Sequence, residues 1–167
     1  TNGGAVWSAI SGSATTISCT ADGSKIFTGN IACSGNGTYL AKFTSSSISV
    51  STNAGASFSV NVPVPASSLS CLAVSGDCTR LVAGVSSGLL YGSANLGATW
   101  TSITTSNQFW SGVWMSEDGS KFAAAVSNNG GTTGGIYAYG VSALPDTIST
   151  NSTISGGQGT AVELQYI

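Results

Sequence analysis

The sequence predicts an all-β protein made of repeated four-stranded antiparallel sheets. Glycine accounts for 23 of the 167 residues and helical periodicity is absent, so long helices are not expected. Two turn motifs recur along the chain at similar spacing, which indicates a repeat architecture. A chain of this length is expected to form a single domain over residues 1–167.

The first turn motif occurs three times without gaps. Each copy has an apolar start, a hydroxyl residue, an aspartate two positions later and a basic residue three positions after the aspartate. Apolar and β-branched residues flank Asp-Gly-Ser or Gly-Asp-Cys, which predicts a hairpin whose turn needs a positive φ. The aspartates are expected to accept hydrogen bonds from turn amides. The copies are ISCTADGSKIF (17–27, with Asp22), LAVSGDCTRLV (72–82, with Asp77) and VWMSEDGSKFA (113–123, with Asp118).

The second turn motif occurs twice, 42 residues apart, as STNAGASF (51–58) and SANLGATW (93–100). Each copy is predicted to be a turn that ends in an aromatic residue opening the next strand. The first motif steps by 55 residues and then by 41, and the extra length lies near residues 29–43, where we expect an inserted loop or hairpin. One unit therefore reads strand, first turn, strand, loop, strand, second turn, strand. The predicted units span 11–62, 69–104 and 111–155, with terminal strands at 5–10 and 161–167.

These units resemble the Asp-box (BNR) repeats of sialidase-like and photosystem-assembly-factor-like β-propellers. SANLGATW fits the S-x-D-x-G-x-T-W pattern apart from Asn95, and STNAGASF fits it with Asn53 and Phe58. The resemblance implies a β-propeller-like array with about three full blades plus terminal strands. In that family these turns are structural and lie away from the catalytic centre, so the resemblance implies that SANLGATW is a structural turn of a degenerate member.

The positions of the charged residues argue against catalysis. Six of the ten occupy equivalent places in the repeated turn, so turn architecture explains them better than one active site does. Histidine is absent from the sequence, which removes a Ser-His triad and a common metal ligand. Sialidases bind their substrate carboxylate with three arginines, and this chain has only Arg80. The sequence therefore predicts no enzymatic activity, no cofactor and no metal site.

Two tryptophans are the best candidates for contact with a ligand or a partner. Aromatic side chains can stack on sugar rings, but most of those in this chain are better explained by packing between sheets. Trp7, for example, aligns with Phe58 and Trp100 at the opening of a strand. Trp110 and Trp114 instead break the repeat, so we expect one or both to contact a ligand or partner.

The cysteines and glycosylation sequons indicate an exported protein. Four cysteines allow three pairings, and their spacing fits zinc poorly, so two disulfides are expected. The pairs Cys71–Cys78 and Cys19–Cys33 are favoured because both links are local. Sequons at Asn36 and Asn151 predict N-linked glycans. Together with the missing initial methionine, which we interpret as the mark of a processed chain, these features predict an extracellular location.

The composition narrows the possible partners. A net charge of −2 with four basic residues argues against binding nucleic acid, and no apolar run is long enough to span a membrane. Three blades do not close a propeller ring. We therefore expect residues 1–10 or 161–167 to pair with another copy of the chain, the alternative being that the two ends pair with each other.

The function predicted from these observations is a secreted, non-catalytic glycoprotein that acts as a self-assembling structural unit of an extracellular fibre or coat. One alternative is a carbohydrate-binding, lectin-like propeller. Another is a degenerate sialidase-like glycoside hydrolase.

Overall fold

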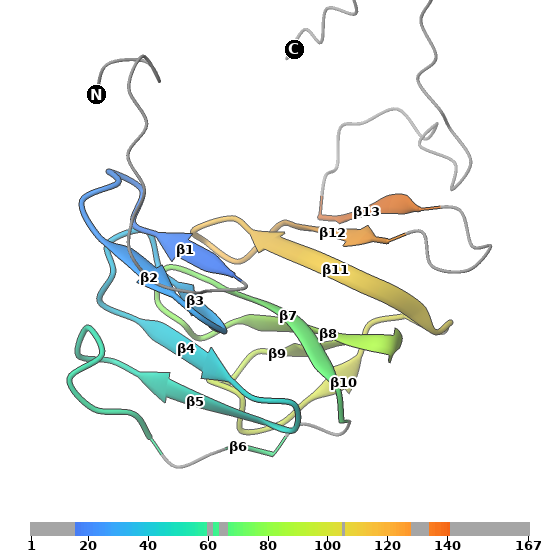
Figure 1. Cartoon of the computed structure of the whole chain (residues 1–167), viewed down its shortest axis with the longest axis horizontal. Helices are drawn as coiled ribbons and strands as arrows, with labels where there is room; N and C mark the ends of the chain where they lie inside the picture. The colour runs from blue at the N-terminus through green and yellow to red at the C-terminus, as the bar shows by residue number, and fades with distance from the viewer. Residues whose placement is uncertain (1–15, 60–61, 64–66, 105, 128–133, 141–167) are drawn as a thin grey trace, which may run out of the picture.

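The computed structural model describes residues 16–59, 62–63, 67–104, 106–127 and 134–140. These residues form an all-β, propeller-like array of antiparallel sheets and contain no helix, as the sequence predicts (Figure 1). Accordingly, the described part of the chain holds no helix with the length and hydropathy needed to cross a bilayer. The strands are β1 (Ile17–Cys19), β2 (Ile26–Thr28), β3 (Ile31–Cys33), β4 (Leu40–Phe43), β5 (Ser47–Ser51), β6 (Val62–Pro63), β7 (Leu69–Val74), β8 (Leu81–Gly88), β9 (Leu90–Ser93), β10 (Thr101–Ser102), β11 (Gln108–Met115), β12 (Phe122–Val126) and β13 (Gly135–Tyr139).

The strands follow one another as antiparallel meanders. The first meander has the order β3-β4-β5-β6 and the second runs β7-β8-β9-β10. The third consists of β11, β12 and β13 in its described part, and the end of β8 also pairs with the start of β11. A separate hairpin, β1-β2, precedes the first meander. Figure 1 shows these four units arranged as an arc, with the strand that opens each unit on the inner side.

The hydroxyl and aspartate of the first turn motif make the same hydrogen bonds in all three predicted copies. In the first copy, the Thr20 hydroxyl donates to Asp22 Oδ1 (2.7 Å), which also accepts from the Ser24 amide (3.0 Å). The Lys25 amide in turn donates to Thr20 Oγ1 (3.1 Å). Asp77 and Asp118 are held in the same way. The prediction that these aspartates occupy equivalent hairpin turns is confirmed.

A fourth copy of this turn lies at Ser34–Tyr39, where asparagine replaces aspartate. The Ser34 hydroxyl and the Thr38 amide both donate to Asn36 Oδ1 (2.9 Å each), and the Tyr39 amide donates to Ser34 Oγ (3.1 Å). The following glycine, Gly37, has the positive φ (70°) found at the same position of the other turns. An amide oxygen accepts the same hydrogen bonds as a carboxylate, so the turn keeps its geometry.

This fourth turn changes the boundaries of the first unit. The segment 29–43 was expected to be an insertion within a unit spanning 11–62, but it supplies β3 and β4, the first two strands of the first meander. The hairpin β1-β2 is the additional element, and it pairs with no third strand among the described residues. With Asn36 as reference, the turn recurs at a constant 41 residues through Asp77 and Asp118. The predicted terminal strands 5–10 and 161–167, and residues 141–155 of the third unit, lie outside the described residues.

The second turn motif is also a structural turn. Ser51 Oγ donates to Asn53 Oδ1 (2.9 Å) and accepts from the Gly55 amide (2.9 Å). The Asn53 amide group donates to Ser57 Oγ (2.8 Å). The copy at Ser93 and Asn95 has the same set of bonds. These side chains are occupied in holding the turn, so the motif does not form a ligand pocket.

The hydrophobic core lies between successive meanders. The first junction packs one face of β3, β4 and β5 against one face of β7 and β8, and its largest fully buried side chains include Ile48 and Leu81. The second junction packs the other face of β7, β8 and β9 against β11 and β12, with Leu90 and Trp110 at its centre. Each meander therefore uses one face toward the unit before it and the opposite face toward the unit after it.

Candidate functional site

A cavity of about 310 Å³ lies inside the arc. The opening strands of the four units, β1, β3, β7 and β11, supply most of its lining, which carries no charged side chain. Its polar side chains carry hydroxyls and thiols, among them those of Ser18, Cys33 and Ser111. An uncharged lining of this kind suits an uncharged occupant, because a buried ion needs a partner.

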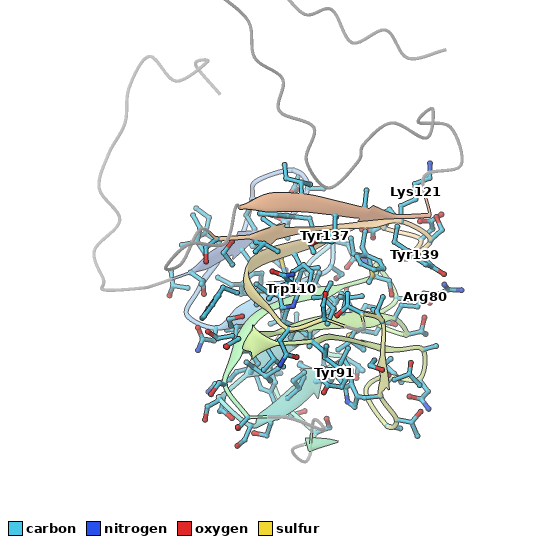
Figure 2. The ribbon with its side chains drawn as sticks, turned by 90° about the vertical axis from the view of Figure 1, so that its right-hand side faces the viewer. Arg80, Tyr91, Trp110, Lys121, Tyr137 and Tyr139 are labelled. Carbon is cyan, nitrogen blue, oxygen red and sulfur yellow. The ribbon has the colours of Figure 1, made fainter. Side chains whose placement is uncertain are left out.

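The two candidate tryptophans have different environments. Trp110 is buried in the second junction, where its indole N–H donates to the Gly88 carbonyl (2.9 Å) and its ring meets Tyr137 edge-on at 5.2 Å between centroids (Figure 2). It is a core residue and is not available to a ligand. Trp114 lines the cavity and is 63% exposed. A Cβ added at Gly112 would lie 2.6 Å from the Trp114 ring, so this glycine lets the indole lie against the strand.

The outward side of the third meander is a junction face that no other part of the described chain covers. By strand pairing, Ile136 occupies the position in the third meander that Ile48 and Leu90 occupy in the first and second. Ile48 and Leu90 fill the two junctions. Ile48 and Leu90 are 0% and 1% exposed, whereas Ile136 is 74% exposed. We call this surface the forward face; its members are Gly112, Trp114, Ala123, Ala125, Ile136 and Ala138.

The hairpin β1-β2 exposes the side that the second and third meanders turn toward the unit before them. The turn alignment places Ile17 at the position of Leu72 and Val113, which are 9% and 6% exposed in the junctions. Ile17 itself is 75% exposed. Cys19, Ile26 and Thr28 share its side of the hairpin because they pair with one another in register. We call the surface formed by Ile17, Cys19, Ile26 and Thr28 the backward face.

The repeated turns, which all follow the opening strand of their unit, contact one another. The Gly76 amide donates to the Glu117 carbonyl (2.6 Å) and the Ala21 amide donates to the Gly35 carbonyl (2.8 Å). The Glu117 carboxylate also reaches back to the Gly35 amide (3.3 Å). Cβ atoms at Gly35 and Gly76 would lie 2.8 and 2.1 Å from this carboxylate, so both glycines make room for it. A hollow of about 480 Å³ opens here, and Asp22, Ser24 and Asn36 share in its lining.

Hydrogen bonding within the turns lowers the pKa of each aspartate. Donation by Thr20, followed by the Ser24 amide and hydroxyl, brings the pKa of Asp22 to about 2. The Ser75 hydroxyl leads the same effect on the pKa of Asp77, and the pKa of Asp118 falls further because Ser116 and Ser120 both donate to it. Carboxylates that accept several hydrogen bonds are held in the ionised form, which suits a structural acceptor rather than a general acid. Arg80 and Lys121 project from two of these turns (Figure 2).

The four cysteines are free thiols in the structure. Cys71 belongs to the second junction and Cys78 to the first, so the favoured Cys71–Cys78 pair is not brought together. The physical reason is that Cys78 occupies the positive-φ position of the turn and points to the opposite side of the sheet from Cys71. Cys19 and Cys33 are neighbours, because the Cys33 thiol lies 3.1 Å from the Cys19 carbonyl oxygen. Burial raises the pKa of Cys33, Cys71 and Cys78, the last to about 11.

The two sequons differ in what the structure says of them. Asn36 is exposed on its turn, and only its Oδ1 atom is used there. Asn151 lies outside the described residues. No group of three His, Cys, Asp or Glu side chains suited to hold a metal occurs within residues 16–59, 62–63, 67–104, 106–127 and 134–140.

Comparison with known proteins shows the fold. No family model and no curated protein match the sequence. The structure is similar to Kuenenia stuttgartiensis hydrazine synthase at 17% identity and a TM-score of 0.59, over 73% of this chain and 44% of that one. It is also similar to a Niastella koreensis GH74 enzyme (22%, TM-score 0.49, over 65% and 19%) and to the β-propeller domain of Myceliophteria thermophila Cps50 (Swd1) (11%, TM-score 0.46, over 65% and 37%). The chain thus spans less than half the length of each of these proteins.

The prediction that the chain is not an enzyme is contradicted by this comparison. The prediction rests on the charged residues of the repeated turns, the absence of histidine and the single arginine, and the hydrazine synthase is an enzyme by name with a similar fold. A repeated turn explains where the charged residues lie, but it does not exclude catalysis elsewhere on a fold. At 17% identity the likeness assigns no activity to this chain and shows that it is an all-β, propeller-like protein.

Proposed function

We propose that this protein is a self-assembling structural unit of an extracellular fibre or coat. The observation that carries the proposal is the pair of junction faces that lack a covering unit among the described residues. Ile136 and Ile17 are exposed at positions whose equivalents inside the arc are buried. Surfaces built like the core of a protein, yet left open, mark sites of association.

The surface composition is compatible with an extracellular assembly. The chain has 49 serine and threonine residues and only ten charged ones, so hydroxyl side chains far outnumber charged side chains. Low charge reduces repulsion between copies. An exposed sequon asparagine, Asn36, supports the glycoprotein part of the proposal. We also assign the chain to the Asp-box repeat proteins, on the basis of the matching serine-asparagine turns at Ser51 and Ser93.

Light scattering coupled to size exclusion tests assembly directly. The Ile136→Asp variant places a charge on the forward face, and we expect the dissociation constant of the assembly to rise on the order of tenfold or more. The matched control is Leu96→Asp, which changes an exposed apolar residue on a turn that belongs to neither end face. A wild-type chain that stays monomeric at high concentration would refute the proposal.

A second candidate function is binding of a neutral carbohydrate. The specific observation is Trp114, whose ring lies against Gly112 at the rim of an uncharged, hydroxyl-bearing cavity. Aromatic rings with an apolar face and neighbouring hydrogen-bonding groups suit a sugar ring. Titration with neutral oligosaccharides, followed by tryptophan fluorescence, tests this function. Binding that survives Trp114→Ala would exclude this site.

A further inference from the structure

The two junctions inside the arc share one pattern of contact. Each unit has a forward side, turned toward the next unit along the chain, and a backward side, turned toward the unit before it. In each junction, the forward side of one unit packs against the backward side of the next. The forward face of the third meander and the backward face of the hairpin are the two halves of such a junction, and each lacks its other half among the described residues. One molecule therefore carries both complementary surfaces, and Ile17 of one and Trp114 of the other line the same cavity.

We infer that copies of this chain associate head to tail, with the forward face of one copy packed on the backward face of the next. This inference rests on the proposed function and specifies its geometry. Neither face includes a charged residue, so no like charges oppose the contact. The two faces differ, so the contact is heterologous and builds a ring if the rotation closes or a filament if it does not.

A contact inside one molecule predicts which residues would meet between two copies. The Ser18 hydroxyl, on the forward side of the hairpin, lies 3.0 Å from the Cys33 thiol on the first meander. The turn alignment makes Trp114 the equivalent of Ser18, and Cys19 the equivalent of Cys33. Head-to-tail packing therefore places Trp114 of one copy beside Cys19 of the next.

The sizes of these side chains fit that pairing. The corresponding positions inside the arc are Ala32 with Val74 in the first junction and Ala73 with Met115 in the second, so a small forward residue corresponds to a larger backward one. Between copies the order is inverted, because the large Trp114 faces the small Cys19. A junction stays filled when a larger side chain on one side is matched by a smaller side chain opposite it. Gly112 provides further room for the indole, since the equivalent residue in the second meander is the larger Cys71.

Disulfide trapping in the full chain tests the inference. Under mild oxidation, the Trp114→Cys variant is expected to form an intermolecular bond with Cys19, seen as dimers and larger species on a non-reducing gel and as a linked 19–114 peptide. The new cysteine replaces an exposed side chain at a position that is small in the other units, so both fold and junction tolerate it. Adding Cys19→Ser should abolish the product. Ala138→Cys lies on the forward face but on its outer strand, and it should not link to Cys19.

The outcomes separate this inference from the proposed function. A 19–114 link confined to single chains would show that the arc closes on itself, and would overturn the inference. A wild-type assembly in which Trp114→Cys never links to Cys19 would overturn it too, while leaving self-assembly in place. A monomeric wild-type chain would refute both.

Discussion

At the scale of single residues, hydrogen bonds among small polar side chains hold the repeated turns in shape. Each of the four turns uses one acceptor oxygen to collect hydrogen bonds from a hydroxyl and an amide, whether the acceptor is Asp22 or Asn36. The acceptor is charged in three turns and neutral in the fourth. This natural difference makes the contribution of the charge testable.

Stability should decline in acid because of the three turn aspartates. Their pKa values are lowered in the folded state, to about 2 for Asp22, from an unfolded value of about 4. A lowered pKa stabilises the fold above the unfolded value, and the contribution is lost as the pH falls from about 4 toward about 2. We expect the melting temperature to drop over this window. In the variant with Asp22, Asp77 and Asp118 all changed to Asn, the drop should be much smaller, and an unchanged pH profile would contradict the assignment.

Trp110 and Trp100, whose indole N–H groups are both packed inside the protein, should respond differently to the same substitution. Trp110 donates to the Gly88 carbonyl, so Trp110→Phe leaves a carbonyl without its partner and should cost about 1–3 kcal/mol. The Trp100 N–H is buried without a partner, and Phe58 occupies the equivalent position of the first meander. Trp100→Phe should therefore cost less than Trp110→Phe. Urea unfolding of both variants measures the difference, and the reverse order would contradict the hydrogen-bond argument.

At the scale of elements, the sequence predicts the repeat but not its first boundary. Three hairpins could be located because an aspartate, a hydroxyl and a base recur at fixed spacing. The hairpin at Ser34–Tyr39 was missed because it has Asn36 in place of the aspartate and Tyr39 in place of the base. The constant spacing of 41 residues from Asn36 to Asp77 and Asp118 was the signal that could have revealed it.

The candidate site was predictable only in part. Trp114 was singled out because it breaks the repeat, and the structure places it on an uncovered face. Trp110 breaks the repeat as well, but it fills a junction, and periodicity alone does not distinguish the two cases. The exposure of Ile17 and Ile136 was not predictable, because both residues look like ordinary core positions within their strands. Only the arrangement of the units shows that nothing in the described chain covers them.

Thiol labelling tests how the strands orient the cysteines. Cys71 and Cys78 are buried in different junctions, and burial raises the pKa of both, so iodoacetamide should modify them only after unfolding. Cys19 is exposed on the backward face and should react in the folded monomer. Peptide mapping under non-reducing conditions gives the readout. A Cys71–Cys78 disulfide in native protein would show that β7 and its turn are arranged differently.

At the scale of the whole molecule, the described units leave an apolar junction face exposed on the third meander and another on the hairpin. Its units are held by apolar junctions rather than by charges, and the end faces are of the same kind. Assembly through them should therefore respond to salt as a hydrophobic contact does.

Added sulfate should strengthen the assembly. Kosmotropic salts favour burial of apolar surface, whereas contacts between ions weaken as salt screens them. We expect the mass average from light scattering to rise when ammonium sulfate replaces sodium chloride at equal ionic strength. Ile136→Asp should reduce the response, because it removes apolar area from the forward face. Dissociation of the assembly by sulfate would indicate an ionic contact instead.

The asparagine in the fourth turn also has a consequence for the ageing of the protein. Asn36 precedes a glycine, the sequence context in which asparagine side chains deamidate most readily. The product with an unrearranged backbone is aspartate, the residue that the other three turns already use, so the turn can keep its hydrogen bonds after the change. The new carboxylate would join Asp22 and Glu117 around the hollow where the turns converge. In copies whose Asn36 carries no glycan, conversion to this aspartate would keep the turn and add one negative charge beside the hollow.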